Sequence, residues 1–255
     1  MSKQNKNRER REMVEQMRRQ ARAAERRRTM VIFAICVVVA LIITGAAIYT
    51  VVKNNREQDR LAGEDLASIG EAAQAAGCTS IKEQDASGQG QHTTEKINYA
   101  VVPPAFGPHN PTPDQSGKHF FTADDRPDVE VLVHNEEHGW TIVWYDDSIA
   151  GNGSQMDLLQ ATADKFDSAG SDFNAHVIIA PWTKDDGNGR PIPDNKHIAF
   201  THWSIHQPNF DPKKFKQDPS WGESQYCDTF SGAALNTFMQ KFPYDDAPEG
   251  SLWHQ

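Results

Sequence analysis

The feature that most constrains this chain is an uncharged apolar run near its N-terminus. Residues 30–52 (MVIFAICVVVALIITGAAIYTVV) contain no Asp, Glu, Lys, Arg or His in 23 positions. At about 1.5 Å per residue, a helix of this length spans roughly 35 Å, which exceeds the roughly 30 Å hydrocarbon layer of a bilayer. The run therefore predicts a transmembrane helix, and only the residues after it are available for a soluble core.

A cleavable signal peptide is the alternative interpretation of the same run. Signal peptides have an apolar stretch of about 7 to 15 residues that ends in a small-residue cleavage site. The run here is longer and lacks a convincing site of that kind. We therefore predict that the segment is an uncleaved, single-pass anchor.

Charge is divided sharply on either side of the run. Residues 1–30 hold 11 Lys and Arg against 4 Asp and Glu, whereas residues 53–255 hold 15 against 31. Basic residues mark the cytoplasmic flank of a membrane helix, so residues 1–29 are predicted to be a cytoplasmic tail and the acidic remainder to lie outside the cytoplasm. The tail is expected to contact anionic membrane lipid, or to serve orientation alone; either role explains its charge without nucleic acid as a partner.

The remaining segments predict one domain connected to the membrane by a stalk. Residues 53–77 are rich in Ala and end in Gly, which predicts a stalk helix. Polar residues 81–95 are expected to be a loop, and residues 102–115, with five prolines, an ordered extended loop. The globular domain is expected over residues 78–245, followed by a C-terminal tail at 246–255.

Hydrophobic periodicity predicts the order of elements in the domain. Strands are predicted at 129–134, 140–145, 176–182 and 197–206, and helices at 155–168 and 232–242. The order strand, strand, helix, strand, strand, helix predicts an α+β fold with helices on one face of a largely antiparallel sheet. Its second half is compatible with a thioredoxin-like arrangement, although the Cys-x-x-Cys motif of thioredoxin redox chemistry is absent from the sequence.

Three cysteines bear on the compartment. Cys36 lies inside the apolar run and is expected to act as a small apolar residue. Cys78 and Cys227 lie in the external part, where an oxidising environment favours a disulfide between them. The alternative is a pair of unrelated buried thiols.

The densest group of chemically active side chains is HNEEH at residues 134–138. It matches the H-x-x-E-H pattern of one metallopeptidase group, in which a helix presents both imidazoles to zinc. Strands are predicted on both sides of the motif, so a metal-dependent hydrolase ranks last among the functions considered. The sequence also lacks Gly-x-Ser-x-Gly and phosphate-binding loops, so the domain is not expected to be an enzyme.

A different metal site is compatible with the same residues. A tight connection brings His134 and His138 together, the proline-rich loop presents His109, and Glu137 offers a carboxylate. Imidazole-rich sites outside the cytoplasm suit copper or zinc. The alternative is that these histidines only hydrogen-bond backbone groups, and Met156, a further candidate copper ligand, is expected to pack in the core.

Two other segments offer weaker signals for ligands. His202 and His206 are four residues apart on a predicted strand and so share a face, and with His197 they are expected to be exposed to solvent. The Asp-rich residues 184–195 resemble a calcium loop only loosely, because Arg190 and Pro191 occupy positions where oxygen ligands are needed.

Four blocks of sequence carry a resemblance to a known family. They are PPAFGPH (103–109), LVHNEEHGWTIVWY (132–145), IAPW (179–182) and IAFTHW (198–203). In this order they resemble the domain of unknown function 3105 family, over roughly residues 78–245, with departures at Glu136 and His202. The resemblance implies a membrane-anchored or secreted bacterial domain, and some members resemble accessory subunits of the cytochrome bcc-aa3 oxidase supercomplex.

The functions are ranked from these observations. A non-catalytic accessory subunit of a membrane complex, with respiratory oxidase subunits as partners, is the leading hypothesis. A copper- or zinc-binding domain or metallochaperone is the alternative, and the two are compatible because oxidases require copper on the external side of the membrane.

Overall fold

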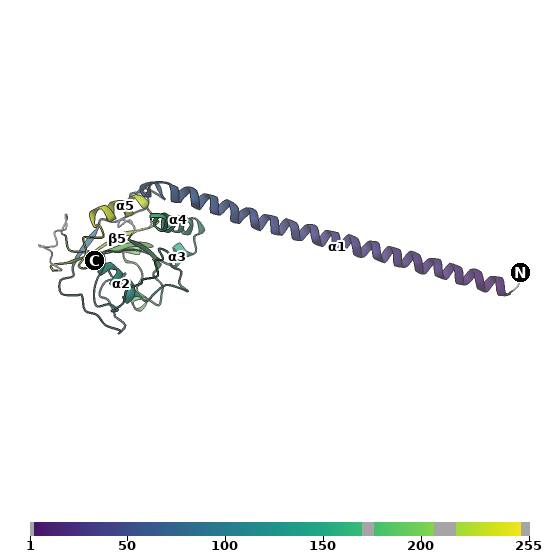
Figure 1. The fold of residues 1–255 in the computed structure, drawn as a ribbon, viewed down its shortest axis with the longest axis horizontal. Helices are drawn as coiled ribbons and strands as arrows, with labels where there is room; N and C mark the ends of the chain where they lie inside the picture. The colour runs from purple at the N-terminus through teal and green to yellow at the C-terminus, as the bar shows by residue number, and fades with distance from the viewer. Residues whose placement is uncertain (1–2, 170–175, 207–217, 251–255) are drawn as a thin grey trace. The chain divides into compact units, whose positions relative to one another are not determined.

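The computed structural model, drawn in Figure 1, describes residues 3–169, 176–206 and 218–250. The chain forms two compact units, residues 1–56 and residues 57–255. The first unit consists of most of one long helix, α1 (Lys3–Gly63). The second unit contains the folded domain and all the candidate site residues.

Helix α1 contains the apolar run. Its stretch Arg11–Leu61 is the one helix among the described residues that is long and apolar enough to cross a membrane. The most apolar 18-residue window has a mean hydropathy of 3.0, and none of that window is buried within the protein. Such an apolar helix in a soluble core would be buried, so α1 is compatible with a membrane anchor.

The helix ends earlier than the stalk prediction requires. The sequence predicts a helix to residue 77, whereas α1 ends at Gly63 and a short 3-10 helix, η1 (Leu66–Ser68), follows. Ile69 is fully buried, and its carbonyl accepts a hydrogen bond from the N–H of Gly232 at 2.8 Å. Packing of Ile69 against the domain therefore outweighs the helix propensity of the Ala-rich segment.

The domain is built on a mixed sheet of five strands in the order β1-β5-β4-β2-β3. The strands are β1 (Lys82–Asp85), β2 (Thr141–Tyr145), β3 (Val177–Pro181), β4 (Ile198–Ser204) and β5 (Trp221–Cys227). Only β2 and β3 pair in parallel, and the other neighbours are antiparallel. The predicted α+β class with a largely antiparallel sheet is confirmed.

Two helices cover one face of the sheet (Figure 1). Helix α4 (Gly153–Ala169), preceded by the single turn α3 (Asp147–Ala150), connects the parallel strands, and α5 (Gly232–Lys241) follows β5. Leu159 of α4 and Phe238 of α5 share a core with Val143 and Phe200 of the sheet. A βαβ unit followed by two antiparallel strands and a helix agrees with the thioredoxin-like arrangement.

Two strands, β1 and β5, were not predicted from the sequence. Strand β1 falls in the segment predicted as a loop, because KEQD is polar and lies at an edge of the sheet, where little apolar area is buried. Strand β5 (WGESQYC) has no clean alternation of apolar and polar residues, and its pairing with β1 and β4 determines its structure. Pairing with distant strands is not visible in a local pattern.

Residues 129–134 form a helix, and the prediction of a strand there was wrong. Helix α2 spans Val129–Glu137, so residues 135–139 are not a connection between strands. Val129, Leu132 and Val133 are buried, at the spacing of one helical face. Packing of that face against the sheet outweighs the strand preference of the valines, and α2 lies on the face opposite α4 and α5.

The predicted disulfide between Cys78 and Cys227 is present, with an S–S distance of 2.02 Å. It connects the segment that enters the domain to the end of β5, and the two cysteines are 149 residues apart in sequence. Cys36 is a free, exposed thiol on α1.

The other predicted elements, at 140–145, 155–168, 176–182, 197–206 and 232–242, are confirmed with shifted ends.

The described part of the predicted C-terminal tail packs on the domain. Asp246 and Ala247 are buried, and the hydroxyl of Ser204 donates to Asp246 at 2.6 Å. The N–H of Glu249 donates to the carbonyl of Glu137 at 2.8 Å. The chain after residue 245 therefore returns to the C-terminal end of α2; residues 251–255 lie outside the described part.

Candidate metal centre

Helix α2 and its C-cap carry three of the predicted ligands. His134, Glu137 and His138 stand at positions i, i+3 and i+4, so their side chains lie along one side of the helix. A different side carries Leu132 and Val133, which are fully buried against the sheet. Packing of the apolar side thus holds His134 and Glu137 on a rigid support.

Two loops bring further imidazoles to α2. His109 lies in the proline-rich loop, which is an ordered loop as predicted and buries His109 completely. His92 comes from the loop after β1, and its backbone lies beside that of His109 in a parallel bridge. The N–H of His109 donates to the carbonyl of Gln91 at 3.0 Å, and the N–H of Thr93 donates to the carbonyl of His109 at 2.7 Å.

The four side chains converge on one point. One ligand atom each from His92, His109, His134 and Glu137 lies within 4.8 Å of all the others. The ring centroids of His109 and His134 are 4.7 Å apart, and that of His92 is 4.9 Å and 5.0 Å from them. We name this set the histidine cluster.

Backbone carbonyls fix the orientation of two of the rings. His109 Nδ1 lies 2.8 Å from the carbonyl of Gly107, and His134 Nδ1 lies 2.5 Å from the carbonyl of Asn110. Because a carbonyl can only accept a hydrogen bond, each Nδ1 carries the donated proton. In the neutral rings, each Nε2 therefore keeps its lone pair, as in histidines that bind a metal through Nε2.

The closest polar contact in the cluster joins His109 and Glu137. His109 Nε2 lies 2.9 Å from Glu137 Oε2. Both atoms are buried, and neither has a partner in hydrogen-bonding geometry among the described residues. A nitrogen lone pair and a carboxylate oxygen repel at this distance, so the pair requires a proton or a metal cation between them.

The surroundings favour neutral imidazoles beside an ionised carboxylate. Burial lowers the pKa of His134 to about 4, and the neighbouring ring of His109 contributes to the decrease. Burial also lowers the pKa of His138 to about 4. Burial raises the pKa of Glu137, but its contact with His109 and the rings of His134 and His138 outweighs this and holds that pKa below its usual value.

His138 belongs to a neighbouring group. Its ring stacks on His134 with centroids 4.7 Å apart, and its Nε2 lies 3.7 Å from Glu249 Oε2. His134, His138 and Glu249 form a second set of ligand atoms within 4.8 Å of one another. The structure thus places three of the four predicted ligands in the histidine cluster and His138 beside it.

His92 and Glu249 were not predicted from the sequence as members of these groups. Both lie in segments without strong periodicity, His92 in the polar loop and Glu249 in the predicted tail. The only sequence signal was the residue type, a histidine in the segment GQGQH and an acid near the C-terminus. Their positions depend on long-range packing against α2.

The position of the motif on α2 gives a different reason to rank a metallopeptidase last. Residues 134–137 of the motif lie on α2 and His138 is its C-cap, so the strand predicted before the motif was wrong, whereas the strand after it, β2, is confirmed. In that enzyme group the motif carboxylate activates water and the two imidazoles bind the metal. Here Glu137 is grouped with His92 and His109 as a ligand, which favours a four-ligand binding site over that catalytic arrangement.

A polar cavity of about 250 Å³ opens onto the cluster. Its lining includes His92, Glu137, Asp218 and Glu249. The loop passes so close that a Cβ added to Gly90 would lie 2.7 Å from Glu137 Oε1. The side chain of His92 is 48% exposed, whereas that of His109 is fully buried, so His92 is the ligand nearest to solvent.

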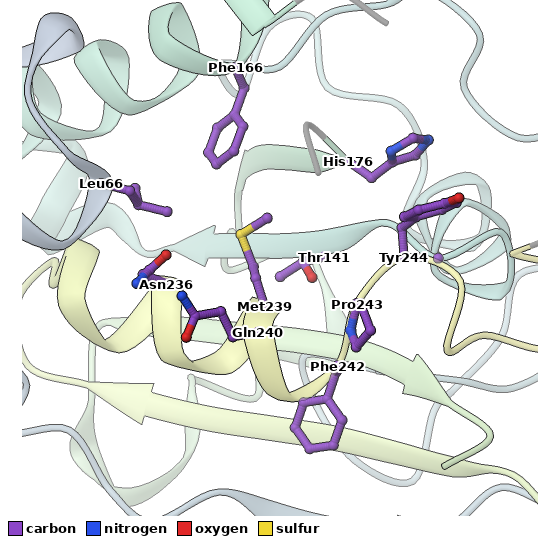
Figure 2. Close-up of a pocket in the computed structure, with 11 residues that line it drawn as sticks. Leu66, Thr141, Phe166, His176, Asn236, Met239, Gln240, Phe242, Pro243 and Tyr244 are labelled. Carbon is purple, nitrogen blue, oxygen red and sulfur yellow. The ribbon is translucent and has the colours of Figure 1, made fainter. Parts of the chain in front are cut away.

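A second cavity, of about 430 Å³, is separate from the cluster and is shown in Figure 2. Phe166 of α4 and Met239 of α5 line it beside Thr141 at the start of β2. Met156 packs against the core on the same side of the sheet. Because α2 lies on the opposite face, Met156 is not a ligand of the histidine cluster, in agreement with its predicted role in the core.

The second group of histidines does not behave as one exposed face. His202 is fully buried, contrary to prediction, because β4 is a central strand covered on both faces. Burial lowers the pKa of His202 to about 4. His197 Nδ1 contacts Asp146 at 2.8 Å, and His206 lies beyond the end of β4 with a φ of 51°. Residues 184–195 connect β3 and β4, as predicted, and contain two short 3-10 helices, η3 (Gly187–Gly189) and η4 (Pro193–Asn195).

Fold and site together define a class of protein. It is an α+β domain that follows an apolar N-terminal helix in the sequence. The domain contains one disulfide and a cluster of three imidazoles and one carboxylate. The family model described as protein of unknown function (DUF3105) matches residues 91–252, and the chain belongs to this family. All residues of the histidine cluster lie inside the matched range. No curated protein and no solved structure matches the chain.

Proposed function

We propose that this chain is a membrane-anchored domain that binds one Zn²⁺ or Cu²⁺ ion at the histidine cluster. The observation that carries the proposal is the convergence of one ligand atom each from His92, His109, His134 and Glu137. His109 Nε2 lies 2.9 Å from Glu137 Oε2, while backbone carbonyls hold the Nδ1 atoms of His109 and His134. A histidine that only stabilises a loop needs one such hydrogen bond. Here one potential ligand atom from each of four residues also lies within 4.8 Å of the others.

The donor set determines the class of metal. Three imidazoles and one carboxylate suit Zn²⁺ and Cu²⁺, whereas Cu⁺ prefers the sulfur ligands that this set lacks. The cavity beside His92 offers a path for an ion or a small ligand from solvent. This arrangement supports transient metal loading, as in a metallochaperone, as well as permanent binding.

The proposed location follows from α1 and the disulfide. If the apolar run is an anchor with the basic tail in the cytoplasm, the domain lies on the external side of the membrane. The disulfide between Cys78 and Cys227 is compatible with an oxidising compartment. Copper and zinc bound at the cluster would therefore be taken from the external side of the membrane.

Elemental analysis of the full-length protein in mild detergent tests the metal proposal. The expected result is one equivalent of zinc or copper after dialysis, reduced to background in His134→Ala. The matched control is His197→Ala, which removes a histidine outside the cluster and should retain the metal. A parent protein without tightly bound metal, or a His134→Ala variant with unchanged content, would remove the proposal.

We also propose that the anchored domain is an accessory subunit of a membrane complex, with the respiratory cytochrome bcc-aa3 oxidase as the expected partner. The apolar window of α1 is not buried within the chain, so its surface is available to another membrane helix as well as to lipid. The acidic domain would then cover the outer face of the complex. Affinity capture in mild detergent should recover oxidase subunits, and recovery of a free monomer at native abundance would contradict this role.

A further inference from the structure

A second group of ligand atoms lies where β1, β5 and the end of β4 meet. One atom each from Glu83, His206 and Glu223 lies within 4.8 Å of the others. The group shares no residue with the histidine cluster. It combines two carboxylates and one imidazole, and so differs from the cluster in its donor chemistry.

The sheet itself brings the two carboxylates together. Glu83 of β1 lies directly opposite Glu223 of β5 in an antiparallel register. Directly opposed residues project on the same side of the sheet, and two like charges in this relationship destabilise the pairing. A positive charge between them would turn this repulsion into attraction.

Glu223 has an incomplete set of polar contacts. Glu223 is fully buried, and its Oε1 accepts a hydrogen bond from His206 Nε2 at 2.7 Å. Oε2 is also buried, and it has no hydrogen-bond partner among the described residues. A buried carboxylate oxygen without a partner is unfavourable, and metal coordination is one way to satisfy it.

The ring of His206 is held between the two acids. It stacks on Trp221 with centroids 4.2 Å apart and an angle of 6° between the planes. Its backbone adopts a left-handed φ of 51°, which turns the chain at the end of β4. Nε2 lies 3.6 Å from Glu83 Oε2 as well as 2.7 Å from Glu223 Oε1.

A cavity of about 410 Å³ adjoins this group and leaves room for further ligands. Glu83, His206, Lys241 and Asp246 line it. Lys241 supplies one positive charge. Three carboxylates oppose it, those of Glu83 and Asp246 in the lining and that of Glu223 beside it. The surroundings therefore favour a small cation whose remaining coordination positions are taken by water.

We propose that Glu83, His206 and Glu223 form a second cation site, which accepts a divalent ion of the Mn²⁺ class. Carboxylate and water ligands suit Mn²⁺, and one imidazole is compatible with it. Binding requires the neutral tautomer of His206 with its proton on Nδ1. Nε2 gives its proton to solvent and Nδ1 takes one up from solvent, which leaves the Nε2 lone pair for the ion. The ion replaces the hydrogen bond between His206 and Glu223 and contacts both acids.

The test is a Mn²⁺ titration of the full-length protein in mild detergent, followed by electron paramagnetic resonance of the free ion. One equivalent of Zn²⁺ is added first, so that Mn²⁺ does not compete for the histidine cluster. Glu83 is half exposed, so Glu83→Gln should leave the fold intact, and Glu223→Gln removes the buried charge without a change of shape. Glu95→Gln is the matched control for loss of one exposed acid.

The parent and Glu95→Gln should each bind one Mn²⁺, with at least tenfold weaker binding in Glu83→Gln and none in Glu223→Gln. Near-ultraviolet circular dichroism verifies that each variant is folded. Absence of Mn²⁺ binding by the parent shows that His206 and Glu223 form an ion pair only, and overturns the proposal. Binding that is insensitive to both substitutions but lost in His134→Ala also overturns it, because the ion then occupies the histidine cluster.

Discussion

His109 Nε2 and Glu137 Oε2 face each other at 2.9 Å in a buried site. The Nδ1–H of His109 is directed to the carbonyl of Gly107, which leaves Nε2 as the ring nitrogen that faces the carboxylate. This relationship is the geometric basis of our proposal that the histidine cluster binds a cation.

Replacement of Glu137 by Gln should weaken metal binding. The amide keeps the shape of the side chain but removes the negative charge that opposes three imidazoles. We expect a loss in metal affinity of at least about 10- to 100-fold, measured by competition with a chromophoric chelator. Glu95→Gln is the control, and equal affinities for the two variants would show that Glu137 is not a ligand.

Substitution at Gly90 should act on the site through Glu137. A Cβ at this position would lie 2.7 Å from Glu137 Oε1, so Gly90→Ala must displace the carboxylate or the loop. We expect weaker metal binding with the thermal unfolding temperature nearly unchanged. Gly153→Ala, where a Cβ meets nothing within 4 Å, should bind metal like the parent. Unchanged affinity in Gly90→Ala would show that the carboxylate position does not matter.

Stability should fall with pH below the usual pKa of histidine because His202 is buried in its neutral form. Its pKa is lowered from 6.5 to about 4, so between these pH values the unfolded chain binds a proton that the folded chain does not. The free energy of unfolding therefore rises with pH in this window, and the contribution of His202 is fully present above pH 6.5. It is lost progressively as the pH falls towards 4.

The variant His202→Phe should reduce that pH dependence by up to about 1.4 kcal/mol per pH unit, the contribution of one proton. Urea unfolding followed by tryptophan fluorescence at several pH values measures the slope. His197→Ala serves as the control, with a slope close to that of the parent. An unaltered slope in His202→Phe would assign the pH dependence to other groups.

The disulfide should contribute strongly to stability. It closes a loop whose ends are 149 residues apart, for which the chain-entropy model gives about 4 to 5 kcal/mol. The double variant Cys78→Ala, Cys227→Ala should lower the free energy of unfolding by about this amount. Cys36→Ala is the control and should leave the unfolding of the domain unaffected. A double variant as stable as the parent would contradict this role.

Local sequence patterns were sufficient for the elements that bury apolar residues at a regular spacing. Strands β2, β3 and β4 and helices α4 and α5 have such patterns, and the two cysteines outside the apolar run predicted the disulfide. Helix α2 was misassigned because its valines satisfy both strand alternation and helical spacing. Packing against the sheet decides between the two, and this packing is a tertiary property.

The histidine cluster was predicted only in part, because local patterns do not report contacts between distant segments. His109, His134 and Glu137 were identified from residue type and from the stiffness of the proline-rich loop. The positions of His92 and Glu249 depend on the backbone bridge between His92 and His109, and on the bond from Glu249 N–H to the Glu137 carbonyl. These contacts join segments far apart in the chain, and no periodicity in the sequence reports them.

The most direct test of the metal site is X-ray absorption spectroscopy of the zinc-loaded, full-length protein. The structure predicts nitrogen and oxygen neighbours at about 2.0 to 2.2 Å, with the outer-shell scattering of three imidazoles and no sulfur. His92→Ala should reduce the imidazole contribution by one ring. A spectrum dominated by water ligands, or one that His92→Ala and His134→Ala leave unchanged, would show that the histidine cluster does not bind the metal.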